Sequence, residues 1–193
     1  MHKGVKLLVL FLSLSGFLFT GCHRVSSPPR IVSINEGEPL DVDILDLWSY
    51  TEEGEEITVE EVPNVNAKVE ISYYETGIGL PTSPKYTAQL TRYTVDFTDV
   101  TTTPPTLTNM DKVNGGCNIV IESGDKNVTQ SILLVSKEWI EKYSGELENG
   151  LVIRARIKFS GIELVSQKEI TSTEGYITIN MCDFEDDPKK RGS

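Results

Sequence analysis

The sequence predicts an all-β fold, an antiparallel β-sandwich of about seven to nine strands with one short helix. First, several short runs alternate apolar and polar residues, the period-two pattern of strands with one buried face. Second, clusters of Gly, Pro, Asn and Ser separate these runs, as turns do. Third, only one segment has helical periodicity, whereas a parallel sheet would need a crossover helix between its strands.

The alternating runs follow one another along the whole second part of the chain. They are residues 39–45, 66–75, 90–99, 117–123, 151–161 and 175–185. The run 151–161 alternates most regularly, and its expected buried residues are Leu151, Ile153, Ala155, Ile157 and Phe159. In 175–185 the apolar phase changes between Met181 and Cys182, which indicates a bulge or a strand buried on both faces.

The single predicted helix covers residues 136–145. Ser136 is a suitable N-cap, Trp139, Ile140 and Tyr143 form an apolar stripe, and Gly145 is a typical C-terminal stop.

The first 21 residues have the features of an export signal. Two lysines precede the apolar run from Leu7 to Phe19, which is about two thirds of the roughly 20 residues that a membrane-spanning helix needs. Leu18-Phe19-Thr20-Gly21-Cys22 resembles the lipobox of bacterial lipoproteins, with Phe19 where that family usually has leucine. The resemblance implies cleavage before Cys22, a lipid on its thiol and attachment to the cell envelope. His23, the following residue, favours the outer membrane.

The remaining chain divides into three parts. Residues 22–38 are rich in Ser, Pro and Glu and are predicted to be the lipidated cysteine with a flexible tether. Residues 39–187 are the predicted sandwich domain, and residues 188–193 a disordered tail. In strand number and size the domain resembles immunoglobulin-like and fibronectin-like sandwiches. The segments LTRYTVDFTD and YITINMCDFED resemble uncharacterised envelope lipoproteins that contain one such sandwich, which implies fold and location only.

Two cysteines remain after Cys22. Cys117 and Cys182 are expected to form a disulfide, because an exported protein meets an oxidising compartment. Closing a loop of about 65 residues would stabilise the fold by roughly 4 kcal/mol. The alternative is two separate buried thiols, which act as small apolar side chains.

The charge and the histidine content exclude several functions. The net charge is −11, and loss of Lys3 and Lys6 with the leader would make it about −13, so nucleic acid is an unfavourable partner. The two histidines, His2 and His23, lie outside the predicted domain, which excludes histidine-dependent catalysis and zinc sites with histidine ligands there. No catalytic residue is predicted.

Calcium is the one metal with support from the composition. Acidic residues cluster where the domain begins and ends, and hard oxygen ligands would converge if the first and last strands were neighbours. The candidates are Asp41, Asp43, Asp183, Glu185 and Asp186. Both clusters are equally typical of charged ends that protect a sheet edge.

These observations predict a lipid-anchored envelope protein that acts as a non-catalytic binding or structural module, with the membrane and another envelope protein or a glycan as partners. Two alternatives are a carbohydrate-binding or carboxylate-dependent glycan-active module and a calcium-stabilised adhesion domain. A glycan-binding platform would need aromatic rings that lie coplanar and exposed. The candidate rings are Trp48, Tyr73, Tyr74 and Trp139.

Overall fold

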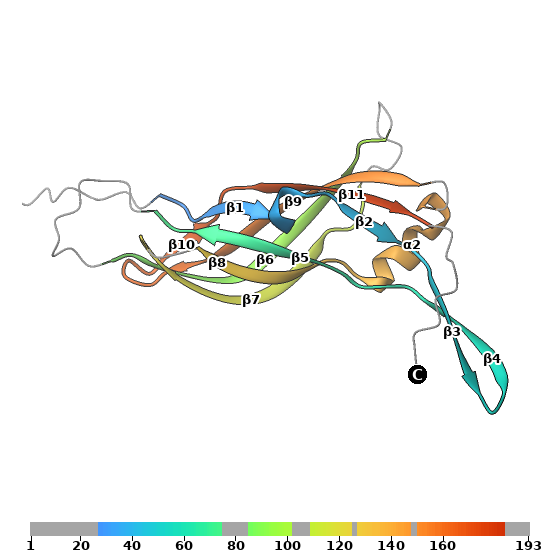
Figure 1. The fold of residues 1–193 in the computed structure, drawn as a ribbon. Coiled ribbons are helices and arrows are strands. Elements are labelled where there is room, and N and C mark those ends of the chain that lie inside the picture. The colour runs from blue at the N-terminus through green and yellow to red at the C-terminus, as the bar shows by residue number, and fades with distance from the viewer. Residues whose placement is uncertain (1–26, 75–84, 102–108, 125–126, 148–149, 184–193) are drawn as a thin grey trace, which may run out of the picture.

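The computed structural model describes residues 27–74, 85–101, 109–124, 127–147 and 150–183, with the backbone alone at residues 46–48. These ranges contain eleven strands, one turn of 3-10 helix and one α-helix (Figure 1). Their order is β1 (Arg30–Ile34), η1 (Asn35–Gly37), β2 (Leu40–Asp43), β3 (Asp46–Glu52), β4 (Glu55–Glu61), β5 (Val65–Ser72), β6 (Thr87–Asp99), β7 (Val113–Glu122), β8 (Val128–Val135), α2 (Lys137–Leu147), β9 (Leu151–Glu163), β10 (Lys168–Thr171) and β11 (Gly175–Cys182).

The strands form two facing sheets and a separate hairpin. Sheet A has the order β1-β5-β8, and sheet B has the order β2-β11-β9-β6-β7, with β10 paired to β9. Two facing sheets of mainly antiparallel strands are the architecture of a β-sandwich. The predicted fold class is therefore confirmed, although the described residues form more strands than the seven to nine expected.

Between β1 and β2 the chain crosses from sheet A to sheet B. The turn η1 makes this change of direction, and Glu36 and Gly37 there have positive φ angles of 59° and 91°. Strand β2 then pairs with β11 in parallel, while the other strand pairs are antiparallel. Two strands distant in sequence, one near each end of the chain, thus lie side by side at the edge of sheet B.

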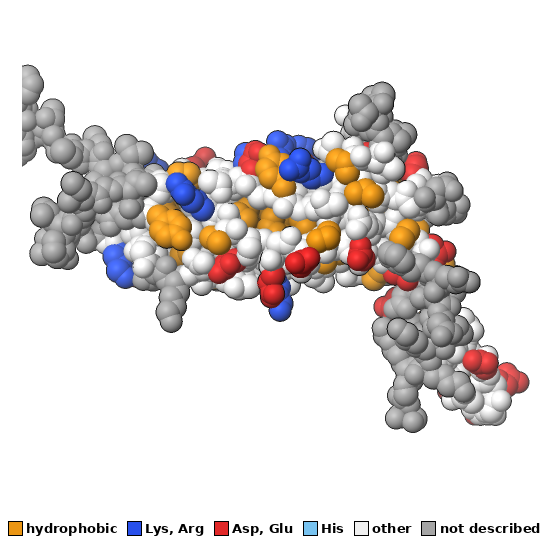
Figure 2. Space-filling model, turned by 45° about the horizontal axis from the view of Figure 1, so that its top comes forward, with side chains coloured by type: hydrophobic (Ala, Val, Ile, Leu, Met, Phe, Trp, Pro, Cys, Tyr) orange, Lys and Arg blue, Asp and Glu red, His pale blue; other side chains and the backbone are white. Residues whose placement is uncertain are grey.

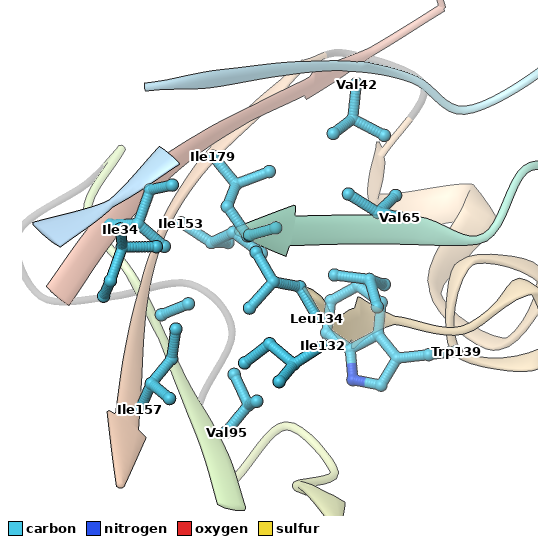
Figure 3. Close-up of a cluster of buried hydrophobic side chains, with 14 of the residues drawn as sticks. Ile34, Val42, Val65, Val95, Ile132, Leu134, Trp139, Ile153, Ile157 and Ile179 are labelled. Carbon is cyan, nitrogen blue, oxygen red and sulfur yellow. The ribbon is translucent and has the colours of Figure 1, made fainter. Parts of the chain in front are cut away.

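The core lies between the two sheets and is closed at one end by α2. Figure 3 shows side chains from both sheets meeting in this space, with Trp139 of the helix beside them. The predicted buried positions of β9 are confirmed, since all five are at most 5% exposed. At about 25 cal/mol per Å² of apolar surface, burial of these side chains is the main stabilising contribution to the fold.

The predicted helix is confirmed, with a later end than expected. Ser136 caps it, because its Oγ accepts the backbone N–H of Trp139 at 3.3 Å. The indole of Trp139 packs on Phe97 with 4.9 Å between ring centroids, and its Nε1 donates to the carbonyl of Asp111 at 2.9 Å. Gly145 does not end the helix, since fully buried Leu147 extends the apolar stripe by one turn.

The predicted tether, residues 22–38, extends too far toward the C-terminus. Residues 30–34 form β1 and pair with β5, and Ile34 is only 5% exposed. The segment Arg-Ile-Val-Ser-Ile does not alternate regularly, and its two isoleucines both face the core because the register shifts between Ile31 and Ser33. The folded domain therefore begins before residue 39. The leader, Cys22 and the tail 188–193 lie outside the described residues.

The expected disulfide is wrong, because Cys117 and Cys182 are free thiols. Cys117 lies on β7 and Cys182 on β11, and β6 and β9 stand between these strands. In the register of sheet B, Cys182 lies beside the first residue of β9, whereas Cys117 lies at the level of Ser160 of the same strand. These two levels are about ten residues, or roughly 33 Å, apart along β9. A disulfide requires Cα atoms within about 7 Å. Burial raises the pKa of both thiols, which makes them less reactive.

A buried carboxylate shapes the turn between β9 and β10. Glu163 is 1% exposed and accepts the backbone N–H groups of Thr87 at 3.2 Å, Val165 at 3.0 Å and Ser166 at 2.6 Å. Burial alone would raise the pKa of Glu163, but a hydrogen bond from the Ser166 side chain, together with these backbone N–H groups, outweighs it and holds the pKa below the ordinary value of 4.5. The charged form is therefore the one that the fold stabilises.

Glu163→Gln is expected to lower the free energy of unfolding by about 1–3 kcal/mol, because it weakens hydrogen bonds to a charged acceptor. Since the folded pKa is depressed, this stabilisation is present above pH 4.5 and is lost as the pH falls through the lower folded pKa. Urea titrations at several pH values would measure it, with Glu169→Gln on exposed β10 as the control. Equal stability of the two variants at neutral pH would contradict the prediction.

Candidate functional site

The outer face of sheet B carries a row of basic side chains along its central strand. Arg154, Arg156 and Lys158 alternate with the buried residues of β9 and so point away from the core. The register places Arg156 between Asp96 of β6 and Tyr176 of β11. This regular alternation is why three cations share one exposed face.

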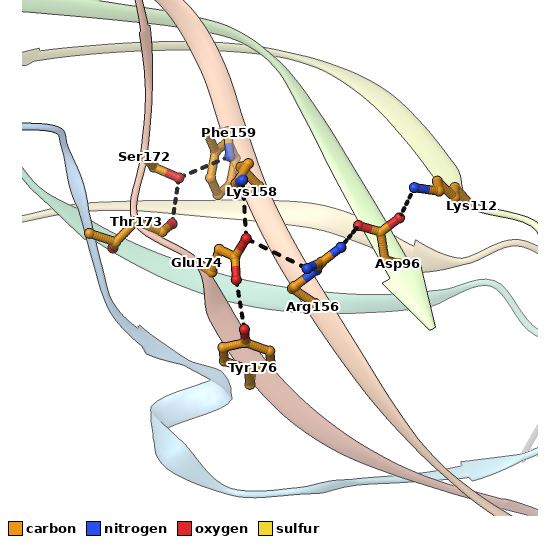
Figure 4. Close-up of polar contacts among 9 residues, drawn as sticks. All are labelled: Asp96, Lys112, Arg156, Lys158, Phe159, Ser172, Thr173, Glu174 and Tyr176. Carbon is orange, nitrogen blue, oxygen red and sulfur yellow. Dashed lines mark hydrogen bonds and ion pairs between the residues drawn. The ribbon is translucent and has the colours of Figure 1, made fainter. Parts of the chain in front are cut away.

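These cations belong to a connected set of ion pairs that crosses several strands (Figure 4). Asp96 forms an ion pair with Lys112 at 2.6 Å through Oδ1 and accepts a hydrogen bond from Arg156 at 2.8 Å through Oδ2. Glu174 pairs with Lys158 at 3.1 Å and with Arg156 at 3.7 Å through Oε1. The Arg156 guanidinium thus bridges the two carboxylates, which fixes its position on the sheet.

The electrostatics of this set keep its carboxylates ionised. Lys112, and then Arg156, lower the pKa of Asp96 below its ordinary value. The Tyr176 hydroxyl, which donates to Glu174 Oε2 at 2.6 Å, and the Lys158 ammonium lower the pKa of Glu174. Neither carboxyl group is therefore tuned to exchange protons near neutral pH, and the arrangement is suited to presenting fixed charge.

An exposed aromatic ring lies within the same face. Tyr176 is 48% exposed, and the guanidinium of Arg154 lies 4.7 Å from the centroid of its ring. A stacked arginine and tyrosine offer both charge and apolar surface, a combination that is frequent at the centre of protein interfaces.

Beside the ion pairs, the face has an open hollow of about 590 Å³. It lies over β6, β7 and the adjacent part of β9, where Gly116 has no side chain to fill the space beside Arg92. Its lining is Arg92, Tyr93, Thr94, Asn114, Gly115, Gly116 and Ser160. Arg92, which is exposed, adds a further cation at the edge of this hollow.

The face is locally basic on a strongly acidic chain. Its central part, over β6 and β9, holds five cations, Arg92, Lys112, Arg154, Arg156 and Lys158, and two anions, Asp96 and Glu174. Toward the edges of the sheet the outward side chains include the acids Asp41 and Asp43 of β2 and Glu122 of β7. The whole chain has a net charge of −11. Figure 2 shows a group of Lys and Arg side chains beside acidic and apolar ones at the upper edge of the body, and several Asp and Glu side chains along the lower edge. A local excess of positive charge attracts an acidic partner.

The calcium candidates are only partly brought together. Strands β2 and β11 are neighbours, so Asp41 lies opposite Asn180 and Asp43 opposite Cys182. Asp41 accepts from the Asn180 amide at 2.7 Å, and Asp43 accepts the backbone N–H of Leu45 at 3.2 Å. Among the described residues no three acidic, His or Cys side chains form a metal-holding group. Asp183 is exposed, Glu185 and Asp186 lie outside those ranges, and calcium binding stays a prediction.

The candidate rings do not form the aromatic platform that a glycan-binding module would need. Tyr73 is 1% exposed and Trp139 5% exposed, so both belong to the interior, while Tyr74 is 48% exposed. The side chain of Trp48 is not described. At most two of the four rings are therefore free to face solvent, which is fewer than the three that would identify a glycan platform.

No site was predicted at Asp96, Arg156, Glu174 or Tyr176. The alternation of Arg154, Arg156 and Lys158 in the sequence does indicate a row of basic side chains on the outward face of a strand. Their contacts with residues of β6 and β11 could not be predicted, because these contacts depend on the register between the strands.

Comparison with known proteins adds no relative. No protein-family model matches the chain, and no curated protein or solved structure is significantly similar to it. Among the described residues, no helix reaches the length and apolarity that a bilayer crossing requires.

Proposed function

We propose that this chain is a lipid-anchored, non-catalytic binding module of the bacterial envelope, and that the outer face of sheet B is its contact surface. The observation that carries this proposal is the basic, hydrogen-bonded face on an otherwise acidic molecule. Its carboxylates are held ionised by fixed cations, so the face supports recognition of charge rather than proton transfer.

The partner that fits this face is a protein with an acidic surface and some exposed apolar area. In the central part of the face, over β6 and β9, five cations exceed two anions, and the Arg154–Tyr176 pair supplies a stacked apolar centre. Planar guanidinium groups suit carboxylates in particular, since they bind them in a bidentate manner. The fixed ion pairs also reduce the entropy that would be lost when a partner binds.

The anchor of this module is Cys22. In cells supplied with a labelled fatty acid, the wild-type chain is expected to incorporate the label and Cys22→Ala to lose it completely, because the thiol is the attachment point that the lipobox resemblance implies. Gel fluorography after immunoprecipitation measures the incorporation. Label retained by Cys22→Ala, or absent from the wild type, would refute lipidation at this residue.

The contact surface is tested by reversing its charge. Arg92→Glu with Arg154→Glu is expected to lower affinity for the envelope partner at least about tenfold, because like charges would then face an acidic partner. Crosslinking and recovery from native envelopes identifies the partner, and titration with that purified protein gives the affinity.

The matched control is Lys68→Glu with Lys137→Glu, which changes the net charge equally on exposed residues of sheet A and α2. Circular dichroism shows whether each variant is folded. Equal affinity of the face variant and the control would contradict the proposed contact surface.

A further inference from the structure

The hairpin β3–β4 stands apart from the two sheets. Within the part of the chain that the structure describes, its strands pair only with each other, from Asp46 opposite Glu61 to Glu52 opposite Glu55. Glu53 and Gly54 make its two-residue turn with φ angles of 53° and 90°, as a type I′ turn requires. Figure 1 shows the hairpin projecting from the end of the body opposite the start of β1.

One face of this hairpin has apolar residues between pairs of acids. Tyr50 lies opposite Ile57 and Trp48 opposite Val59 in the register, with Glu52 and Glu55 opposite each other next to the turn. Tyr50 is 38% exposed, and Ile57 and Val59 are half-buried. Like charges directly opposite each other destabilise an antiparallel pair. A basic surface placed on this face would relieve that repulsion.

The charge of the hairpin is of one sign. Residues 46–61 contain seven Asp and Glu and no Lys or Arg. A hollow of about 400 Å³ next to the turn is lined by Glu52, Glu53, Glu55 and Ile57, and is therefore suited to a basic side chain with an apolar stem. A two-stranded hairpin is only marginally stable in water, so covering its apolar face would also stabilise it.

We propose that the apolar face of the β3–β4 hairpin docks on the outer face of sheet B of a second copy of this chain. The two surfaces are complementary: Glu52, Glu55 and Glu61 would meet the cations of sheet B, and Tyr50 and Ile57 would meet the exposed ring of Tyr176. This inference rests on the proposed function, because it takes the same contact surface and names its partner.

The docking joins two different surfaces. A contact between unlike surfaces is heterologous, so a pair of copies keeps one unused hairpin and one unused face, and a linear chain of copies can grow. The hairpin projects away from the body and therefore does not lie on sheet B of the same copy (Figure 1).

Sedimentation of the purified full chain in density-matched detergent tests this docking. Protein concentrations up to about 1 mM would detect association even with a weak dissociation constant. The average mass of the wild type is expected to rise with concentration beyond that of a monomer. The hairpin variant Glu52→Lys with Glu55→Lys, and the face variant Arg92→Glu with Arg154→Glu, should each remain monomeric. An equimolar mixture of the two should associate again, because the unchanged face of the first accepts the unchanged hairpin of the second.

The control Glu141→Lys with Glu146→Lys places the same added charge on exposed positions of α2 and should associate like the wild type. A wild type that is monomeric throughout, or variants that associate unchanged, would overturn the docking. If the wild type is monomeric while the face variant still loses an envelope partner, the proposed contact surface stands and only the second copy is excluded.

Discussion

Replacing Gly161 by Ala is expected to lower the free energy of unfolding by more than about 3 kcal/mol and to leave little folded protein. Gly161 of β9 lies directly opposite Leu90 of β6. A Cβ at this position would overlap the carbonyl oxygen of Gln89 and lie 2.7 Å from the Cα of Leu90. These are backbone atoms, so no side-chain rotation can relieve the overlap, and the strands must separate.

Gly116→Ala is the matched control, because it is another glycine of sheet B and a Cβ there meets no atom within 4 Å. Its effect is expected to stay within about 0.5 kcal/mol. Urea denaturation followed by tryptophan fluorescence compares the two variants. If Gly161→Ala were as stable as Gly116→Ala, the close approach of β6 and β9 would be wrong.

The second large effect is expected at the seam between the two sheets. The hydroxyl of Tyr93 on β6 accepts the backbone N–H of Leu133 at 3.1 Å and donates to its carbonyl at 3.2 Å. Leu133 lies on β8, an edge strand of sheet A, so this side chain takes the place of a neighbouring strand there. The ring lies over Gly115 of β7, where a Cβ would overlap it.

Tyr93→Phe is expected to lower the free energy of unfolding by about 1–3 kcal/mol, because it leaves the N–H and carbonyl of Leu133 without this partner. Gly115→Ala should cost a similar amount by displacing the ring. Because both changes disturb one contact, the double variant should lose less than the two single losses together. Strict additivity in urea titrations would contradict the shared contact, and exposed Tyr176→Phe serves as the control, with an effect below about 0.5 kcal/mol.

Strong alternation made much of sheet B predictable. In β9 every second residue is apolar over ten positions, and the structure buries those residues as expected. Strand β8 was missed, because Ile132, Leu133, Leu134 and Val135 form a continuous apolar run rather than an alternating one. Strand β1 was missed because it is short and flanked by Pro and Ser, and its pairing with β5 depends on a partner 35 or more residues away.

The failure of the disulfide prediction has the same physical origin. Sequence separation states how many residues lie between Cys117 and Cys182, but not which strands stand between them or how far along those strands each residue lies. For the candidate site, the outward row of Arg154, Arg156 and Lys158 follows from alternation alone. Its contact with Asp96 depends on the register of β6, which an irregularity between Leu90 and Arg92 shifts.

Lysine footprinting in intact envelopes tests the contact surface most directly. The acylation rate of each lysine is compared between the dilute purified chain and the same chain in its native membrane. Lys112 and Lys158 lie on the outer face of sheet B, whereas Lys68 lies on sheet A and Lys137 on α2. We predict that Lys112 and Lys158 are protected in the envelope while Lys68 and Lys137 react at unchanged rates. If the ratio of the acylation rate in the envelope to that in the purified chain were equal at all four lysines, a partner on this face would be contradicted.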